Sequence, residues 1–73
     1  MNAIEVQGNT HFVYPHQLKV VAHSDLETKV KASYFRGSHY LIEAQYEKGI
    51  LFFDSITDYP KDEVVFLDRV TIP

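Results

Sequence analysis

The sequence contains no cysteine and no tryptophan, and it has only three glycines and three prolines. Without cysteine, disulfides and thiolate metal sites are excluded. No run of 18 apolar residues is present, and the first residues lack the basic start and apolar stretch of a signal peptide. Small secreted domains usually carry disulfides, so we expect a cytoplasmic domain without direct membrane insertion.

The sequence also lacks the motifs of the common nucleotide and hydrolase sites. Its three glycines, Gly8, Gly37 and Gly49, are too far apart for a phosphate-binding loop of either common pattern. No serine lies in the pattern of a hydrolase nucleophile elbow. We therefore expect no catalysis and no cofactor in this domain.

Length and charge restrict the class further. The chain has 73 residues, which is enough for one domain with a small core. Hydrophobic residues make up 45% of it, so it is expected to fold rather than remain disordered. The net charge of −3 argues against a module that binds nucleic acid through its phosphates.

Alternating polar and apolar residues predict strands over most of the chain. Residues 28–35 alternate, with Val30, Ala32 and Tyr34 on one face and Lys29, Lys31 and Ser33 on the other. Further strands are predicted at residues 39–46, 50–54 and 64–72, separated by turns at 36–38, 47–49 and 59–62. About five to six short strands indicate an all-β fold, which we expect to be a small barrel of the OB or SH3 type.

The segment HFVYPHQLKVV, residues 11–21, is interrupted by Pro15. Proline cannot donate a ladder hydrogen bond, and it biases the preceding Tyr14 toward extended geometry. We interpret residues 15–17 as a corner between a strand that ends at Tyr14 and one that restarts at Leu18. A corner is the ordinary role of proline in a sheet, and it is favoured over a ligand site.

Histidines and carboxylates offer few candidates for chemistry. The spacings of His11, His16, His23 and His39 match no zinc motif, so we expect unrelated surface histidines and no metal. Acidic residues gather in the C-terminal half, where loop solvation is favoured over acid–base work. They are Asp54, Asp58, Asp62, Glu63 and Asp68.

Six aromatic residues in the predicted strands invite a base-stacking interpretation. Such a platform needs interleaved basic residues, and the segment richest in them, residues 29–36, has only three. A core role is therefore favoured for most of these aromatics. They are Tyr34, Phe35, Tyr40, Tyr46, Phe52 and Phe53.

An ordered series of short motifs resembles one family. The segment FVYPHQL, residues 12–18, resembles the proline signature that opens the TOBE domain of ABC importer ATP-binding subunits. VKASYFRG, YLIEA, GILF and YPKDEVVFL follow in the order that the family has. The structural motif positions are Tyr14, Pro15, His16, Leu18, Gly37 and Gly49. The chain departs from the family pattern at Tyr14, where arginine is usual, and at Asp62, where glycine is usual.

The resemblance implies an OB-like barrel that follows an ATPase domain and does not hydrolyse ATP. Such domains pair two ATPase subunits and, in some importers, bind substrate or a regulator. The histidine after the proline, His16, resembles the importers of the sulfate, molybdate or iron(III) class. The implied partners are the ATPase domain and the membrane subunits of a transporter, which would place the chain at the inner membrane. Residues 1–73 would then be the C-terminal part of a longer subunit, excised or separately encoded.

Two other functions remain open from the sequence. A free-standing oxyanion-binding barrel would use backbone N–H groups with Ser33, Ser38 and Lys48 as weak ligand candidates. A single-stranded nucleic-acid binder is disfavoured by the acidic balance. In the segment ILFFD both faces are apolar, so we expect Leu51 or Phe53 to remain at the surface and form the contact of a weak homodimer.

Overall fold

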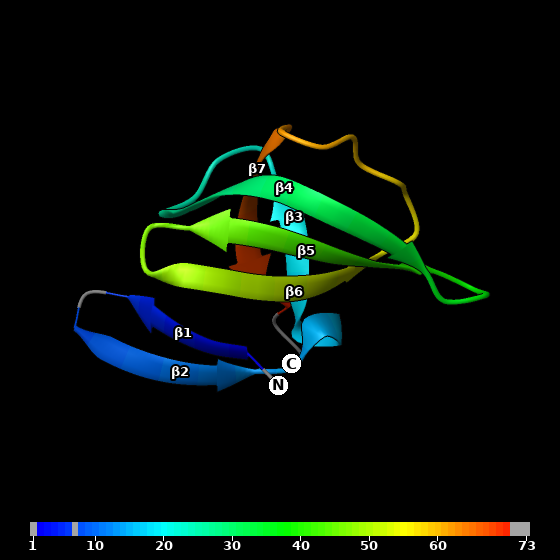
Figure 1. Cartoon of the computed structure of the whole chain (residues 1–73). Coiled ribbons are helices and arrows are strands. Elements are labelled where there is room, and N and C mark those ends of the chain that lie inside the picture. The colour runs from blue at the N-terminus through cyan, green and yellow to red at the C-terminus, as the bar shows by residue number, and fades with distance from the viewer. Residues whose placement is uncertain (1, 7, 71–73) are drawn as a thin grey trace.

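The computed structural model describes residues 2–6 and 8–70 and contains seven antiparallel strands in two sheets (Figure 1). One sheet is the hairpin of β1 (Asn2–Val6) and β2 (Asn9–Val13). The other has the order β3-β7-β4-β5-β6. Its strands are β3 (Leu18–Val21), β4 (Leu26–Phe35), β5 (Tyr40–Tyr46), β6 (Gly49–Ser55) and β7 (Val64–Arg69).

The all-β prediction is confirmed, with two differences in detail. There are seven strands rather than five or six, and the described strands do not close into a barrel, because β1 and β2 pair only with each other. The predicted last strand ends at Arg69, and its residues 71 and 72 lie outside the described part. No helix within residues 2–6 and 8–70 has the length and apolar character to cross a membrane.

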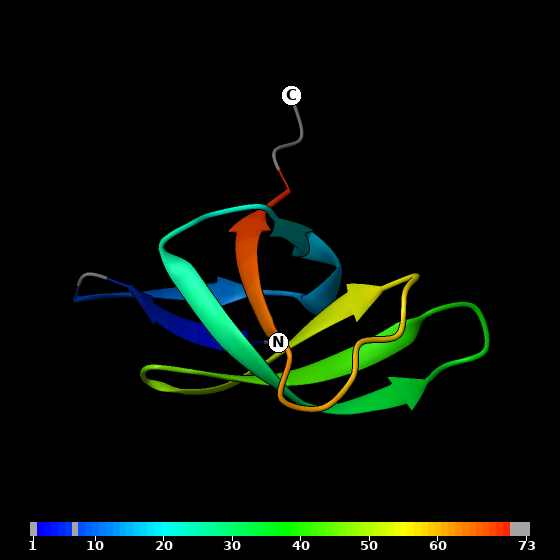
Figure 2. The same ribbon diagram turned by 90° about the horizontal axis from the view of Figure 1, so that it is seen from above.

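The five-stranded sheet curls strongly around its own apolar side. Seen from above, β7 runs across the direction of β5 and β6 (Figure 2), and β3 lies behind these two strands in the view of Figure 1. The two edge strands, β3 and β6, therefore approach each other without pairing. The hairpin closes this side and contributes Ile4 and Val13 to the same core.

The core takes alternate residues from each strand. In β5 and β6 these are Tyr46, which is 9% exposed, and the fully buried Ile42, Ala44, Leu51 and Phe53. The prediction that Leu51 or Phe53 forms a surface contact is therefore wrong. Both faces of ILFFD are apolar, and the curl of the sheet together with the hairpin covers the face that carries these two side chains. Ile50, on the opposite face, is the exposed one, with 47% of its surface accessible.

A β-bulge in β4 changes which side chains face the core. Val30 pairs with Ala44 and Ala32 pairs with Glu43, so Lys31 is an extra residue without a partner in β5. Directly paired residues point to the same side, and Ser33 pairs with the buried Ile42 while Tyr34 pairs with Leu41. The predicted alternation is therefore wrong beyond Lys31, because one extra residue reverses the two faces.

Two side chains fasten the hairpin to the sheet. The Asn2 amide donates to the Phe52 carbonyl at 2.6 Å and accepts from the Phe52 N–H at 2.7 Å. The Tyr46 hydroxyl accepts from the Glu5 N–H at 3.0 Å. Phe52 lies on the edge strand β6, so the Asn2 side chain occupies the place where the backbone of another strand would pair.

The proline corner is confirmed as a short turn that carries the chain from one sheet to the other. Residues Pro15–Gln17 form a single 3₁₀ turn, with the Gln17 N–H donating to the Tyr14 carbonyl. The Gln17 side-chain oxygen accepts from the Tyr14 N–H at 2.8 Å. Leu18 then enters the core, where it is almost fully buried.

The turn before β7 holds Asp62 in a backbone conformation that suits glycine, the residue usual at this position in the resembled family. Asp62 has a φ of 74°, a left-handed conformation that glycine adopts without cost. The Glu63 N–H donates to the Pro60 carbonyl, so Asp62 is the third residue of a β-turn. Its own N–H donates to the Val30 carbonyl at 2.8 Å, which fixes the turn against β4.

We predict that Asn2→Ala lowers the free energy of unfolding by about 1–3 kcal/mol, because the Phe52 N–H and carbonyl lose their partners at a partly buried place. Asn9→Ala is the matched control. Asn9 lies on the same hairpin, is exposed, and makes no side-chain hydrogen bond with the described residues. Urea denaturation of both variants measures the difference, and equal stabilities would contradict the role of the Asn2 amide.

We further predict that Asp62→Ala lowers the free energy of unfolding by about 1 kcal/mol, because alanine adopts the left-handed conformation less readily than aspartate does, although both carry a Cβ. Asp62→Gly relieves the strain but loosens the unfolded chain, so it stays within about 0.5 kcal/mol of the parent. Thermal unfolding of the three proteins gives the order, and a more stable alanine variant would contradict it.

Candidate interaction face

The side chains of β4, β5 and β6 that point away from the core form one continuous surface, which we call the outer face. The pairings place Tyr34 beside Leu41 and Asp54, and Ala32 beside Glu43 and Phe52. Within residues 2–6 and 8–70, neither the hairpin nor the other two strands of the sheet cover it (Figure 1). The outer face consists of Lys29, Ala32, Tyr34, Leu41, Glu43, Gln45, Ile50, Phe52 and Asp54.

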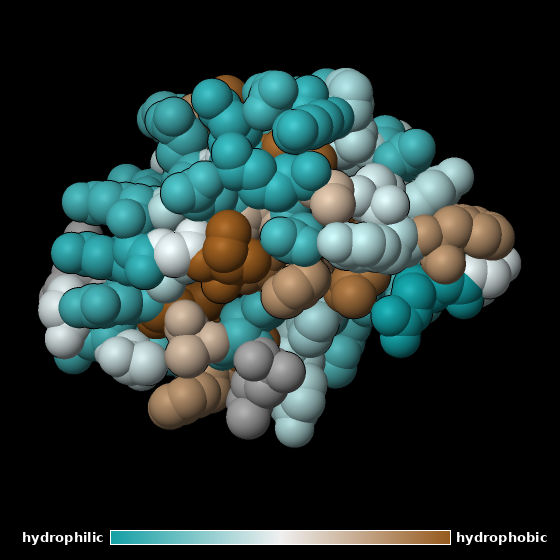
Figure 3. All heavy atoms as spheres, in the orientation of Figure 1, coloured by the Kyte–Doolittle hydropathy of each residue, from teal (hydrophilic) through white to brown (hydrophobic). Residues whose placement is uncertain are grey.

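The middle of the outer face is apolar. Ile50 and Tyr34 are each 47% exposed, and Leu41 and Phe52 are half-buried. Figure 3 shows brown and tan side chains gathered across the middle of this view, with hydrophilic residues above and to the side. A cluster of exposed apolar side chains rimmed by polar ones is typical of a surface that binds another protein.

Polar contacts on the outer face are few and local. The Tyr34 hydroxyl donates to a Glu43 carboxylate oxygen at 2.9 Å, which connects β4 to β5. This hydrogen bond, and then the negative charge of Glu43, raise the pKa of Tyr34 above its ordinary 10.0, with a smaller contribution from burial. At the far end His39 Nε2 lies 3.7 Å from an Asp54 carboxylate oxygen.

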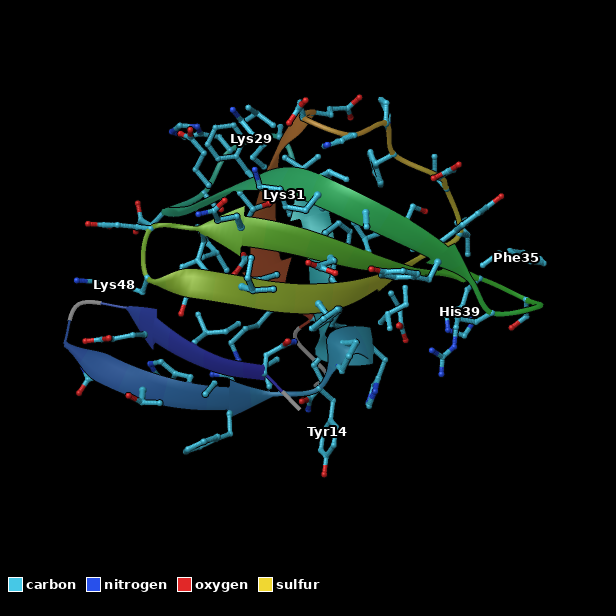
Figure 4. All side chains as sticks on the ribbon, viewed as in Figure 1. Tyr14, Lys29, Lys31, Phe35, His39 and Lys48 are labelled. Carbon is cyan, nitrogen blue, oxygen red and sulfur yellow. The ribbon has the colours of Figure 1, made fainter. Side chains whose placement is uncertain are left out.

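Basic residues border one end of the outer face. Lys29 and Lys31 project from β4, and Lys48 lies in the β5–β6 turn, whereas Phe35 and His39 lie at the opposite end of these strands (Figure 4). None of these lysines forms an ion pair with another described residue. The mixture of Glu43 and Asp54 with the lysines gives the face no dominant charge, which does not favour a nucleic-acid backbone.

The aromatic residues divide between the core and the surface. Tyr46 and Phe53 are buried, and Tyr40 packs against the core, so the core role expected of most of the six holds for three of them. Tyr34 and Phe52 lie on the outer face. Phe35, the last residue of β4, is 66% exposed, and its ring contacts that of Tyr40 at a centroid distance of 5.2 Å.

The weak ligand candidates do not converge. Ser38 lies in the β4–β5 turn and Lys48 in the β5–β6 turn, at opposite ends of the seven-residue strand β5. Strand geometry separates these ends by roughly 20 Å. Ser33 faces the core from β4, where its buried hydroxyl oxygen has no hydrogen-bond partner. One copy of the chain therefore cannot close these three residues around an anion.

The histidines and carboxylates are also dispersed. His11, His16 and His23 are exposed on three different segments, and His39 is half-buried beside Ser38 and Asp54. Among residues 2–6 and 8–70, no group of three or more histidine and carboxylate side chains is placed to hold a metal ion. His16 stacks on Tyr14 at the proline corner, with ring centroids 5.7 Å apart.

The glycine positions of the motif series lie in turns. Gly37 has a φ of 94° in the β4–β5 turn, and Gly49 begins β6 directly after the β5–β6 turn. Comparison with known proteins gives no further assignment, because no family model, no curated protein and no solved structure matches the chain.

Sequence reasoning missed the outer face because it assigned the wrong apolar side of β6 to the surface. No residue pattern marks the bulge at Lys31, so Tyr34 was placed on the same face as the buried Val30. A usable signal was the register of β5 with β6: because Ala44 is opposite Leu51, Ile50 and Phe52 share a side with Gln45 and Glu43.

We predict that Glu43→Gln lowers the pKa of Tyr34 toward its ordinary value, because it removes the negative charge and retains an acceptor. Since the folded pKa is raised, the neutral hydroxyl stabilises the fold at pH values below about 10, and this contribution is lost as the pH rises through the folded pKa. NMR titration of the tyrosine rings measures the shift, with Tyr34→Phe to assign the signal. An unchanged Tyr34 titration in the glutamine variant would contradict it.

Proposed function

We propose that this chain is a non-catalytic regulatory and oligomerisation domain of an ABC importer ATP-binding subunit, and that its outer face is the contact surface. The observation that carries the proposal is the apolar middle of this face, where Ile50 and Tyr34 are each 47% exposed and no other described strand covers them. Removing these side chains from water favours association, at roughly 25 cal/mol per Å² of apolar surface.

The association with ABC importers rests on the ordered motifs. The support from geometry is that three positions of the motifs, Pro15, Gly37 and Asp62, lie at turns of the kind that these residues favour. Pro15 begins the 3₁₀ turn between β2 and β3, and Gly37 has a positive φ. Asp62, where the resembled family has glycine, also has a positive φ. A domain of this kind would pair two ATPase subunits and would act at the membrane through its transporter.

The oxyanion-binding barrel is a weaker second proposal. It requires Ser33, Ser38 and Lys48 to meet, and within one copy Ser38 and Lys48 lie at opposite ends of β5. Only an interface between copies would bring such residues together, so this function also depends on association of the chain.

We predict that the chain self-associates in a concentration-dependent way and that Ile50→Glu weakens the association at least about tenfold, or 1.4 kcal/mol. Val20→Glu is the control, since Val20 is an exposed valine, 37% accessible, on β3, which contributes no residue to the outer face. Sedimentation from micromolar to millimolar concentration measures both. A strict monomer, or equal weakening by both substitutions, would contradict the outer face as the contact.

A photo-crosslinking residue at Gln45 tests the identity of the partner in cells that make the chain. Gln45 is exposed in the row that contains Ile50. The expected adducts are a second copy or a polypeptide with a phosphate-loop ATPase domain, identified by mass spectrometry. The same residue at Val20 is the control. Adducts only with proteins that lack such a domain would contradict the assignment to an importer.

A further inference from the structure

The outer face carries opposite charges at two opposite corners. Strand pairing arranges its nine side chains in three rows that cross β4, β5 and β6. Lys29 ends the first row on β4, and Asp54 ends the last row on β6. The other two corners, Ile50 and Tyr34, are the most exposed apolar side chains of the face. The rows are Lys29, Gln45 and Ile50; Ala32, Glu43 and Phe52; and Tyr34, Leu41 and Asp54.

A two-fold axis along the diagonal from Ile50 to Tyr34 would match this face to a second copy of itself. The axis lies in the plane of contact and exchanges the two corners that are off the diagonal. Lys29 of one copy then lies against Asp54 of the other, and the reverse contact forms by symmetry. With the usual rise along a strand and spacing between strands, the two Cα positions come within roughly 5 Å of each other in the plane of contact. A lysine side chain spans such an offset.

The other pairs that this axis brings together suit one another in size. Leu41 lies over the small Ala32 of the second copy, so a large side chain meets a small one. Phe52 lies over Gln45, whose side chain is exposed in the single chain. The strands of the two copies cross at roughly 70°, which is nearer to the orthogonal class of sheet packing than to the aligned one.

The charged side chains at the corners are available for contacts between copies. Lys29 is exposed and forms no ion pair with another described residue. The Asp54 side chain is 31% exposed, and its one ion-pair partner among the described residues is the His39 ring at 3.7 Å. Glu43 lies on the axis, so two carboxylates approach there, although each accepts a hydrogen bond from the Tyr34 hydroxyl of its own chain. Two exchanged ion pairs oppose this one pair of like charges.

We propose that the outer face binds the outer face of a second copy of this chain, with the two-fold axis along the diagonal from Ile50 to Tyr34. Lys29 and Asp54 pair across the axis in both directions. This inference rests on the proposed contact surface and adds to it the partner, the symmetry and the register. Exposed ion pairs contribute little affinity, but like charges brought together reject other arrangements, so the two pairs fix how the copies face each other.

Charge reversal tests the exchange. Lys29→Asp alone and Asp54→Lys alone should each weaken self-association roughly tenfold, because each homodimer then contains two contacts between like charges. An equal mixture of the two variants should associate about as well as the parent, because both contacts in the mixed dimer again join opposite charges. Sedimentation measures the homodimers and the mixture. The control is a mixture of Lys19→Asp and Asp25→Lys, which has the same net charges at exposed positions away from the outer face.

Cross-linking tests the position of the axis. The chain has no cysteine, so each substitution by cysteine introduces a single thiol. A bismaleimide with a short spacer should join two copies of the Ile50→Cys variant, because Ile50 faces itself across the axis. It should not join two copies of the Lys29→Cys variant, but it should join Lys29→Cys to Asp54→Cys.

Two results would overturn the inference. One is a mixture of Lys29→Asp and Asp54→Lys that associates no better than the control mixture, and the other is equal cross-linking of Ile50→Cys and Lys29→Cys. If association still depends on Ile50 in either case, the proposed contact surface stands without this symmetry, whereas a strict monomer contradicts both. Thermal unfolding confirms that each variant folds. Lys29→Gln and Asp54→Asn replace a variant that does not, and each should reduce the weakening of association by salt.

Discussion

The Asn2 side chain is the contact on which the arrangement of the two sheets depends. Its amide supplies a donor and an acceptor to Phe52, as a neighbouring strand would, at 2.6 and 2.7 Å. The Tyr46 hydroxyl adds a hydrogen bond from the Glu5 N–H and one to the Ala3 carbonyl, so the side chains of Asn2 and Tyr46 together hold β1 against the sheet. The hairpin in turn covers Leu51 and Phe53, and it leaves a groove of about 430 Å³, lined by Ile4, Val13, Leu18 and Leu67 among others, between its own inner side and β3.

This arrangement also explains why the surface of so small a domain divides into two separate regions. One apolar side of β6 becomes core because the hairpin and the curl of the sheet cover it. The other side stays open and carries Ile50. The outer face therefore results from a strand that is apolar on both sides but covered on only one. The groove has the reverse character, since its floor is buried and its rim carries the charges.

The edge of β6 shows how the fold limits unwanted pairing. An open edge presents backbone donors and acceptors to any other extended chain. Asn2 uses those of Phe52, and β3 at the other end of the sheet is only four residues long. Association through the outer face, which buries side chains rather than an edge, is therefore compatible with a defined oligomer.

The sequence by itself determined the all-β class, the corner at Pro15 and the turns around Gly37 and Asp62, because these depend on alternation and on local backbone preferences. Tertiary structure decided which apolar side of residues 50–54 is buried, since both sides are apolar and only the hairpin distinguishes them. It also decided on which face of the sheet Tyr34 lies. The bulge at Lys31 depends on the register between β4 and β5 and on the hydrogen bond from the Asp62 N–H to the Val30 carbonyl. The groove depends on residues from four strands, and no local pattern brings Ile4 and Leu67 together. Pairing over such sequence separations is set by the packing of the whole chain rather than by any one segment.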